Sequence, residues 1–152
     1  MKQAKLNYNQ IDNYIYVGTN MCCTIALDPE LIKKGISADI SLEEKKVDAP
    51  LGVDYYIWLP TKDHYAPSLE KMLFGVLSLD YFVQNKIKTF VHCKEGHTRA
   101  PTLVAAYLIY SRKLTTEQAI KLIKKKRPVT HISPQQLSAL HEFEKYLQKN
   151  CK

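Results

Sequence analysis

The sequence predicts a single α/β domain with a central, mostly parallel sheet of four or five strands flanked by helices. Short segments rich in β-branched and aromatic residues alternate with longer segments whose apolar residues recur at helical spacing. The last third of the chain is helical throughout, and strands that alternate with helices are typical of α/β domains. A chain of 152 residues suits one domain with its own core, so we assign residues 1–152 to it.

The first half of the chain contains one short helix and three predicted strands. The helix begins at Asp28, an N-cap residue, with Pro29 at the first helical position. Gly35 ends it, because glycine readily adopts the left-handed conformation that closes many helices. The strands are rich in β-branched and aromatic residues and cover residues 14–17, 36–42 and 54–59.

The second half begins with a loop from Pro60 to Pro67 and continues into a long helix predicted over residues 68–85. A short buried strand, 88–92, and a strongly apolar helix, 100–110, follow with a loop between them. Two further helices begin at capping boxes, which pair Thr115 with Gln118 and Ser133 with Gln136. The long helix has an apolar stripe at helical spacing, made of Leu69, Met72, Leu73, Val76, Leu79 and Phe82.

Composition indicates a globular protein with excess positive charge. Apolar residues make up 45% of the chain, and the net charge is +7, which attracts anions. We expect no nucleic-acid partner, because no recognised binding motif accompanies the charge. A run of cations closes one helix, where it opposes the negative helix end; a membrane or polyanion patch is the alternative reading of this run. It comprises Lys121, Lys124, Lys125, Lys126 and Arg127.

Neither a membrane span nor a metal site is expected. The chain has no apolar run of about eighteen residues, and the segment Met1–Lys5 lacks the apolar stretch of a signal peptide. We therefore expect a cytoplasmic protein with reduced cysteines. No C-x-x-C pair occurs, and the neighbours Cys22 and Cys23 would bridge each other only with strain. The sequence thus predicts no metal and no cofactor.

The segment that carries chemistry is Val91-His92-Cys93-Lys94-Glu95-Gly96-His97-Thr98-Arg99, between a strand and a helix. A loop that enters a helix turns its backbone N–H groups inward and forms an anion nest, and Gly96 permits the required backbone conformation. Arg99 can grip two phosphate oxygens. The same positive field stabilises a thiolate at Cys93, which makes it a nucleophile. The predicted phosphate-binding residues are Lys94, Glu95, Gly96, His97, Thr98 and Arg99.

Two other residues complete this prediction. A thiolate that attacks a phosphate monoester needs a proton donor for the leaving group. Asp63 fits, because its loop follows a strand edge and can overhang the nest, whereas Asp54 begins a strand and Asp80 lies inside a helix. Two roles are open to His92. We prefer that of a buried histidine whose hydrogen bonds hold the loop, rather than that of a catalytic base. The predicted catalytic residues are therefore Cys93, Arg99 and Asp63.

With these residues the chain resembles the dual-specificity-type cysteine phosphatases, whose HC-x-x-G-x-x-R loop matches His92, Cys93, Gly96 and Arg99. The resemblance runs from about residue 14 to residue 146 and implies the cysteine phosphatase fold. It also implies a metal-free, two-step reaction through a phosphocysteine, with Asp63 as acid and then as base. Low-molecular-weight tyrosine phosphatases carry the loop near the N-terminus and fit less well.

The resemblance leaves the substrate open. The first candidate substrates are proteins that carry phosphotyrosine, and also phosphoserine or phosphothreonine. The short chain has no evident room for the insertions that deepen a tyrosine-only pocket. A phospholipid headgroup is the alternative, since Val91-His92-Cys93-Lys94 looks like the mitochondrial phosphatidylglycerophosphate phosphatases. The segment Arg99-Ala100-Pro101 looks like that of the plant glucan phosphatases. No carbohydrate-binding module is present, which weakens the case for a glucan substrate. A basic rim of Lys62, His64, Lys94 and His97 would suit the phospholipid.

Other functional expectations concern partners and departures from the family pattern. A pseudophosphatase that only binds phosphorylated partners usually lacks the cysteine, which is present here. We expect a monomer, and peripheral membrane contact stays open. Ala100 stands where the family has a hydroxyl that can bond to the cysteine sulfur, which predicts a slow second step. Thr98 replaces a frequent glycine, and Glu95 places an acid in the anion-binding loop, where it either points outward or disfavours very acidic substrates.

Overall fold

The computed structural model describes residues 6–19 and 26–150 of the chain. Within them, five strands form one sheet in the order β1-β2-β5-β3-β4. Every neighbouring pair is parallel except β1 with β2. The predicted α/β class with a mostly parallel sheet is therefore confirmed. The strands are β1 (Tyr8–Gln10), β2 (Ile15–Thr19), β3 (Ile36–Ser41), β4 (Tyr55–Trp58) and β5 (Lys88–Cys93).

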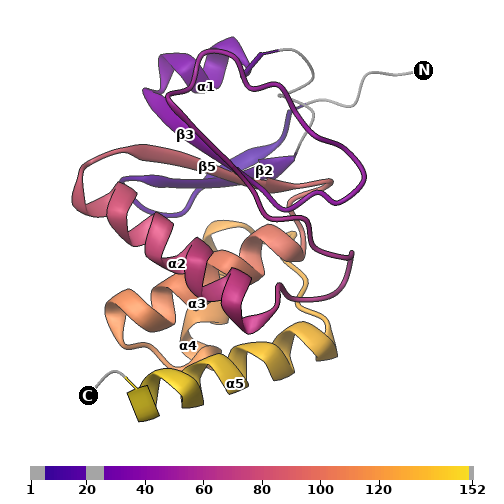
Figure 1. The fold of residues 1–152 in the computed structure, drawn as a ribbon, viewed down its shortest axis with the longest axis vertical. Coiled ribbons are helices and arrows are strands. Elements are labelled where there is room, and N and C mark those ends of the chain that lie inside the picture. Colours follow the sequence, from indigo (N-terminus) through magenta and orange to yellow (C-terminus); the bar gives the residue numbers. More distant parts are fainter. Residues whose placement is uncertain (1–5, 20–25, 151–152) are drawn as a thin grey trace.

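Helices cover both faces of the sheet (Figure 1). Helix α1 lies on one face, and four helices lie on the other, with α3 next to the sheet strands β2 and β5. Residues 99–109 of α3 are all buried, which explains why the sequence of this helix is apolar on every side. The helices are α1 (Pro29–Lys33), α2 (Leu69–Gln84), α3 (Arg99–Arg112), α4 (Thr116–Lys126) and α5 (Pro134–Asn150).

Side-chain caps fix the helix starts where the sequence predicts them. The Asp28 side chain accepts a hydrogen bond from the backbone N–H of Glu30 at 2.8 Å. The capping box of Thr115 and Gln118 is present in both directions. Ser133 and Gln136 make the same reciprocal pair, at 2.9 and 3.2 Å. Each cap satisfies N–H groups that a helix start leaves without an intrahelical partner.

The core consists of two apolar clusters separated by the sheet. The larger one packs strand residues such as Val17, Ile40 and Val91 against α2–α5. The smaller one packs Tyr16 and Phe90 against α1 and its flanking residues. Alternate residues of β2 and β5 thus face opposite clusters, as the two-residue period of a strand requires. None of the helices in the described ranges is long and apolar enough to cross a membrane.

Two features differ from the sequence prediction. Strand β1 was not predicted, because it has three residues, Tyr8–Gln10, without apolar alternation; it pairs antiparallel to β2. Leu69, predicted on the apolar face of α2, is 47% exposed. Phe74, Leu77 and Tyr81 of the same helix are also exposed. The predictions for Met1–Lys5, Cys22 and Cys23 concern residues outside the described ranges.

The parallel strands end at one edge of the sheet, where ligands bind in open α/β folds.

Candidate active site

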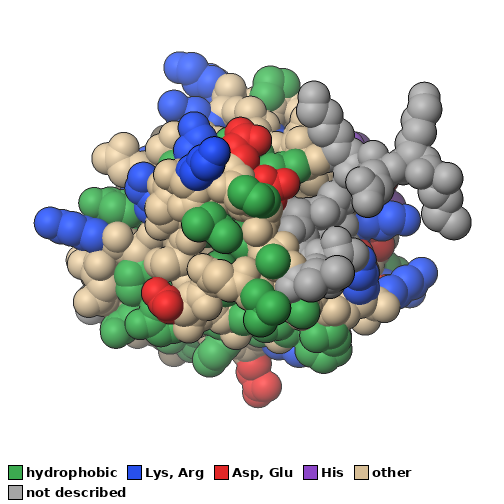
Figure 2. Space-filling view, turned by 90° about the horizontal axis from the view of Figure 1, so that it is seen from above, with side chains coloured by type: hydrophobic (Ala, Val, Ile, Leu, Met, Phe, Trp, Pro, Cys, Tyr) green, Lys and Arg blue, Asp and Glu red, His purple; other side chains and the backbone are tan. Residues whose placement is uncertain are grey.

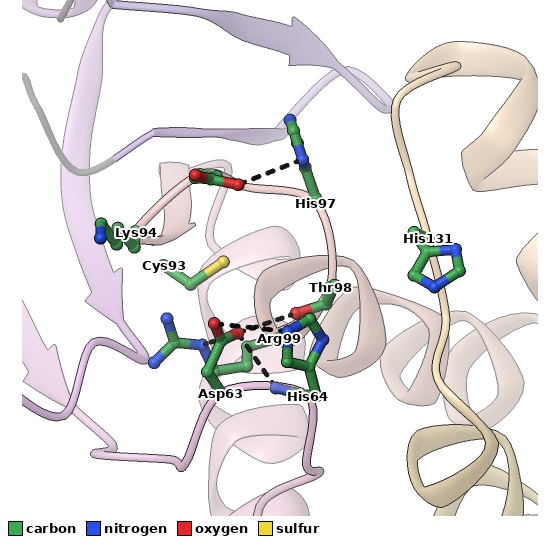
Figure 3. A pocket seen from close by; sticks show the side chains of 9 residues that line it. Asp63, His64, Cys93, Lys94, His97, Thr98, Arg99 and His131 are labelled. Atoms are coloured by element: carbon green, nitrogen blue, oxygen red, sulfur yellow. Dashed lines mark hydrogen bonds and ion pairs between the residues drawn. The ribbon is translucent and has the colours of Figure 1, made fainter.

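A cavity of about 420 Å³ opens at this edge, around the loop that connects β5 to α3 (Figure 3). The structure brings together in it all the predicted catalytic residues and the predicted phosphate-binding residues other than Gly96, whose backbone forms the loop. Two histidines, His64 and His131, complete the lining. The full lining is Asp63, His64, Cys93, Lys94, Glu95, His97, Thr98, Arg99 and His131.

The conformation of this nest loop, residues 93–99, depends on Gly96. Its φ is +68°, in the left-handed region that side chains disfavour. A Cβ at this position would also collide with the carbonyl group of Gly18 in β2. The loop therefore packs directly on a strand backbone. Any other residue at position 96 would push the loop away from the sheet and distort the nest.

The guanidinium group of Arg99 lies at the bottom of the cavity and is held from one side. Its Nη1 donates to the backbone carbonyls of Thr61 at 2.9 Å and Leu42 at 3.3 Å. A carboxylate oxygen of Glu43 lies 3.7 Å from the same nitrogen. Because Arg99 is only 2% exposed, these partners fix its orientation. A planar guanidinium anchored in this way can present its other N–H groups to an anion.

Asp63 lies over the nest loop and contacts two of its residues. Its Oδ1 is 3.4 Å from Nε of Arg99 and accepts a hydrogen bond from the Thr98 hydroxyl at 3.5 Å. The backbone N–H of His64 donates to the same oxygen at 3.0 Å. The side chain is 54% exposed, so the carboxyl group can exchange protons with solvent. The predicted acid, Asp63, therefore lies beside Arg99 at the mouth of the cavity.

His92 does not line the cavity but lies buried beneath it. Its Nε2 is 2.7 Å from a carboxylate oxygen of Asp39 and 3.7 Å from one of Asp48. Its ring stacks on Phe90, with 5.2 Å between ring centroids. Burial raises the pKa of Asp48, and the charge of His92 opposes that shift. The geometry fits a histidine that holds the base of the loop, not a catalytic base.

Arg127 corrects one sequence prediction, which placed it with the lysines that close α4. The three preceding lysines are exposed, but Arg127 is fully buried. Its Nε donates to the Gly96 carbonyl at 2.8 Å and its Nη2 to the Glu95 carbonyl at 3.2 Å. Its Nη1 donates to the side chains of Asn7 and Asn9 at 2.9 and 2.8 Å. Burial lowers its pKa, and the charge on Cys93 opposes that shift.

Arg127 therefore ties the nest loop to the N-terminal strand. Sequence reasoning missed this role, because helical spacing predicts only the end of a helix at this position. One signal was available: the run of lysines ends with an arginine that directly precedes a proline. Arginine is suited to buried carbonyl and amide acceptors, because its five N–H donors have a fixed arrangement.

His131 is the second site residue that the sequence did not reveal. Its backbone N–H donates to the carbonyl of His97 at 2.7 Å, which places its side chain at the cavity. The predicted basic rim changes accordingly. His64, Lys94 and His97 line the cavity, whereas the ammonium group of Lys62 lies over the Tyr65 ring, 4.8 Å from its centroid.

Ala100 lacks the hydroxyl group that the family has at this position, and its surroundings show whether another residue could supply one. Thr98 and Thr102 are the neighbouring residues with hydroxyl groups, and both groups are engaged. The Thr98 hydroxyl faces Asp63, and the Thr102 hydroxyl donates to the backbone carbonyl of Thr98 at 2.7 Å. Ala100 itself is fully buried. Neither threonine is therefore oriented as a substitute donor to the cysteine sulfur.

One group of side chains in the described ranges has the donor atoms of a metal site, and it lies on α4 and α5. It consists of Glu117, His141 and Glu144, whose donor atoms lie within 4.8 Å of one another. His141 pairs with Glu117 at 3.1 Å, and Glu144 accepts hydrogen bonds from the start of α4. These contacts explain the group as a link between two helices.

Known proteins resemble this chain over most of its length. The profile of the family described as "Dual specificity phosphatase, catalytic domain" matches residues 15–146. The Arabidopsis thaliana protein "Phosphatidylglycerophosphate phosphatase PTPMT2" is 30% identical over 149 residues, or 91% of this chain and 63% of that protein. The Homo sapiens protein "Phosphatidylglycerophosphatase and protein-tyrosine phosphatase 1" is 42% identical over 82 residues, or 53% of this chain and 40% of that protein. The chain thus spans less than two thirds of either relative.

Solved structures agree with this similarity. The crystal structure of PTPMT1 superposes with a TM-score of 0.81 at 27% identity, covering 95% of this chain and 98% of that one. A second structure, PTPMT1 in complex with PI(5)P, gives a TM-score of 0.82 at 26% identity, with 95% and 99% of the chains covered. Human DUSP28 shares the fold, with a TM-score of 0.83 at 20% identity over 93% of this chain and 98% of that one.

Proposed function

Since the chain belongs to the dual specificity phosphatase family, we propose that it hydrolyses phosphate monoesters through a covalent intermediate on Cys93. The observation that carries this proposal is the convergence of Cys93, Arg99 and Asp63 on one cavity. Cys93 is 2% exposed, so its sulfur lies at the base of the site with Arg99. Asp63 lies next to Arg99 and is 54% exposed, so its carboxyl group can reach the leaving group of a substrate bound in the cavity.

In the first step, the Cys93 thiolate attacks phosphorus. A sulfur–phosphorus bond forms, the ester phosphorus–oxygen bond breaks, and Asp63 gives its proton to the leaving oxygen. Arg99 and the N–H groups of the nest loop hold the non-bridging oxygens, whose charge they stabilise. Anchoring of Arg99 on Thr61 and Leu42 supports this role, because the clamp is oriented before substrate binds.

In the second step, the Asp63 carboxylate accepts a proton from a water molecule whose oxygen attacks phosphorus. The sulfur–phosphorus bond breaks, and its electron pair returns to the Cys93 thiolate. The products of the two steps are an alcohol and inorganic phosphate, so the cycle consumes one ester and one water. Asp63 regains its proton and is ready for the next substrate.

For the substrate we propose a phospholipid headgroup of the phosphatidylglycerophosphate class, with phosphotyrosine as the second candidate. Sequence motifs alone placed phosphorylated proteins first. The match to an Arabidopsis phosphatidylglycerophosphate phosphatase, over 91% of this chain, favours the lipid. The human relative bears the names of both activities, which keeps phosphotyrosine as a candidate. The cavity volume of about 420 Å³ leaves room for more than a phosphoryl group.

A direct comparison of substrates tests this proposal. Purified protein would be assayed for phosphate release from phosphatidylglycerophosphate in mixed vesicles, from PI(5)P, and from phosphotyrosine and phosphothreonine peptides. We expect the highest kcat/KM for phosphatidylglycerophosphate and no turnover by Cys93→Ser. A higher kcat/KM for the phosphotyrosine peptide would reverse the order of the two candidates. Substrate binding without turnover of any of them, including para-nitrophenyl phosphate, would identify a phospho-binding pseudophosphatase.

A further inference from the structure

Three imidazole rings stand around the mouth of the cavity, each on a different segment. His64 belongs to the loop before α2, His97 to the nest loop, and His131 to the connection between α4 and α5. In Figure 3, His97 lies higher than the Cys93 sulfur, His64 lies lower, and His131 lies to the right of both. Three imidazoles from distant parts of the chain thus line one cavity, and the hydrolysis steps leave them unused.

The histidines lie at a different depth from the phosphate clamp. Arg99 and Cys93 are each 2% exposed, whereas the side chains of His64 and His97 are 64% and 42% exposed. The nest loop and Arg99 account for one phosphoryl group at the bottom of a cavity of about 420 Å³. The imidazoles therefore line the outer part, where the rest of the substrate lies when its phosphoryl group is in the nest.

The charges that face this outer part allow an anion to bind. The carboxylates in the lining are Asp63 and Glu95, and each already faces an imidazole. Asp63 lies 3.7 Å from Nε2 of His64, and Glu95 lies 3.5 Å from Nδ1 of His97. Lys94 adds a cation, and His131 approaches from the opposite wall. Imidazoles donate hydrogen bonds when neutral and gain a positive charge when protonated.

We propose that His97 and His131, with Lys94 and His64 beside them, form a second anion subsite that binds a phosphodiester of the same substrate molecule. This inference rests on the proposed phosphatase function and specifies its substrate class. The preferred substrates carry a phosphate monoester and a phosphodiester on one small polyol, as phospholipid headgroups do. A phosphotyrosine side chain has no second phosphate at a fixed separation and would leave this subsite unused.

Two water-soluble probes test the subsite without a membrane. Glycerol 3-phosphate offers a phosphate monoester alone, and deacylated phosphatidylglycerophosphate offers the same monoester with a phosphodiester. The ratio of their kcat/KM values isolates the second anion, because effects on the monoester cancel. We expect the wild-type ratio to favour the diester-containing probe by roughly 10- to 100-fold, since hydrogen bonds to charged groups have this effect on binding.

Variants assign the effect to particular residues. His131→Gln and His97→Gln should each lower the ratio roughly 3- to 10-fold, and the double variant should bring it close to one. Glu95→Gln should raise it, because a negative charge at the mouth is removed. His141→Gln is the matched control, since this histidine lies on α5 and pairs with Glu117. It should leave both kcat/KM values unchanged.

Binding to Cys93→Ser separates the subsite from catalysis, because affinities are measured there without turnover. If neither probe is hydrolysed but the diester-containing probe binds Cys93→Ser more tightly, the proposed substrate fails and the subsite stands. If both probes are hydrolysed with equal kcat/KM, the subsite is overturned and the phosphatase function stands. The same follows if neither histidine substitution changes the ratio of the two kcat/KM values. Stronger binding of a phosphotyrosine peptide with acidic neighbours than of the headgroup would also overturn the headgroup assignment.

Discussion

The guanidinium of Arg127 donates a hydrogen bond from Nε to the backbone carbonyl of Gly96 over 2.8 Å. The donor lies directly after α4, and the acceptor is the glycine on which the nest loop turns. A residue distant in sequence thus fixes the loop that carries Cys93. The same side chain reaches Asn7 and Asn9, so the loop, α4 and the N-terminal segment are linked through one buried cation.

Replacement of Arg127 should therefore damage both stability and activity. Arg127→Ala leaves four acceptors without their donor, among them the buried Gly96 carbonyl, so we expect a loss of about 2–4 kcal/mol. That loss corresponds to a fall in Tm of roughly 5–15 °C, measurable by calorimetry. Arg127→Lys should be intermediate, since it keeps the charge but not the arrangement of donors. Lys126→Ala, at an exposed neighbouring position, is the control. Equal Tm values for the Arg127 and Lys126 variants would contradict this role.

Asp63→Asn should lower kcat by roughly 10²–10⁴ on alkyl phosphate esters, because the leaving oxygen then lacks a proton donor. Steady-state kinetics on alkyl and aryl esters would show a smaller loss for para-nitrophenyl phosphate, whose leaving group needs less assistance. Asp54→Asn, at an exposed aspartate before β4, controls for the loss of one negative charge. Similar losses for both ester types would point away from Asp63 as the acid.

Ala100→Ser should accelerate breakdown of the phosphocysteine by roughly tenfold or more. A serine hydroxyl can donate to the cysteine sulfur and stabilise it as a leaving group, as hydrogen bonds to charged groups do. Rapid-quench kinetics of the wild type should show a product burst that shrinks in the variant. Thr102→Val should not slow this step selectively, because its hydroxyl bonds to the Thr98 carbonyl. A slow second step in Thr102→Val, with no change in Ala100→Ser, would transfer the role to Thr102.

The buried carboxyl group of Asp48 should make stability depend on pH. Burial raises its pKa, so the folded protein holds this proton more tightly than the unfolded chain. Its contribution to stability is therefore full below the unfolded value of about 3.9 and is lost as pH rises through the folded value. Asn at this position stays neutral. Hence the stability of Asp48→Asn relative to wild type should rise from pH 4 to pH 7.

Urea unfolding of both proteins at several pH values would measure this difference. Asp54→Asn, at an exposed aspartate, would be measured in parallel as the control. A constant or falling difference for Asp48→Asn would mean that the charged carboxylate is well accommodated beside His92, which lies 3.7 Å away.

Features encoded within a few residues were predictable from the sequence. The caps at Asp28, Thr115 and Ser133 satisfy N–H groups at most three positions away, so spacing alone reveals them. The nest loop was equally accessible, because Cys93 to Arg99 is one continuous segment between a strand and a helix. The strand-helix alternation likewise predicted the sheet and its parallel pairing.

Features created by long-range pairing were not predictable. Arg99 is held by Leu42 and Glu43, which follow β3, and by Thr61, which follows β4. These residues reach it because β3 pairs with both β5 and β4. His131 joins the cavity through a backbone contact with His97 that no local pattern encodes. Arg127 looked like the end of a lysine run, since burial of a charged group depends on acceptors supplied by other segments.

The most direct test of the central claim is identification of the covalent intermediate. Asp63→Asn would be mixed with para-nitrophenyl phosphate, quenched in acid within milliseconds, digested and mapped by mass spectrometry. This variant should accumulate the intermediate, since the good leaving group permits the first step while the second lacks its base. We predict one phosphate bound to Cys93 and none in Cys93→Ser. Phosphate on His97 or another residue, or turnover by Cys93→Ser near the wild-type rate, would contradict the account.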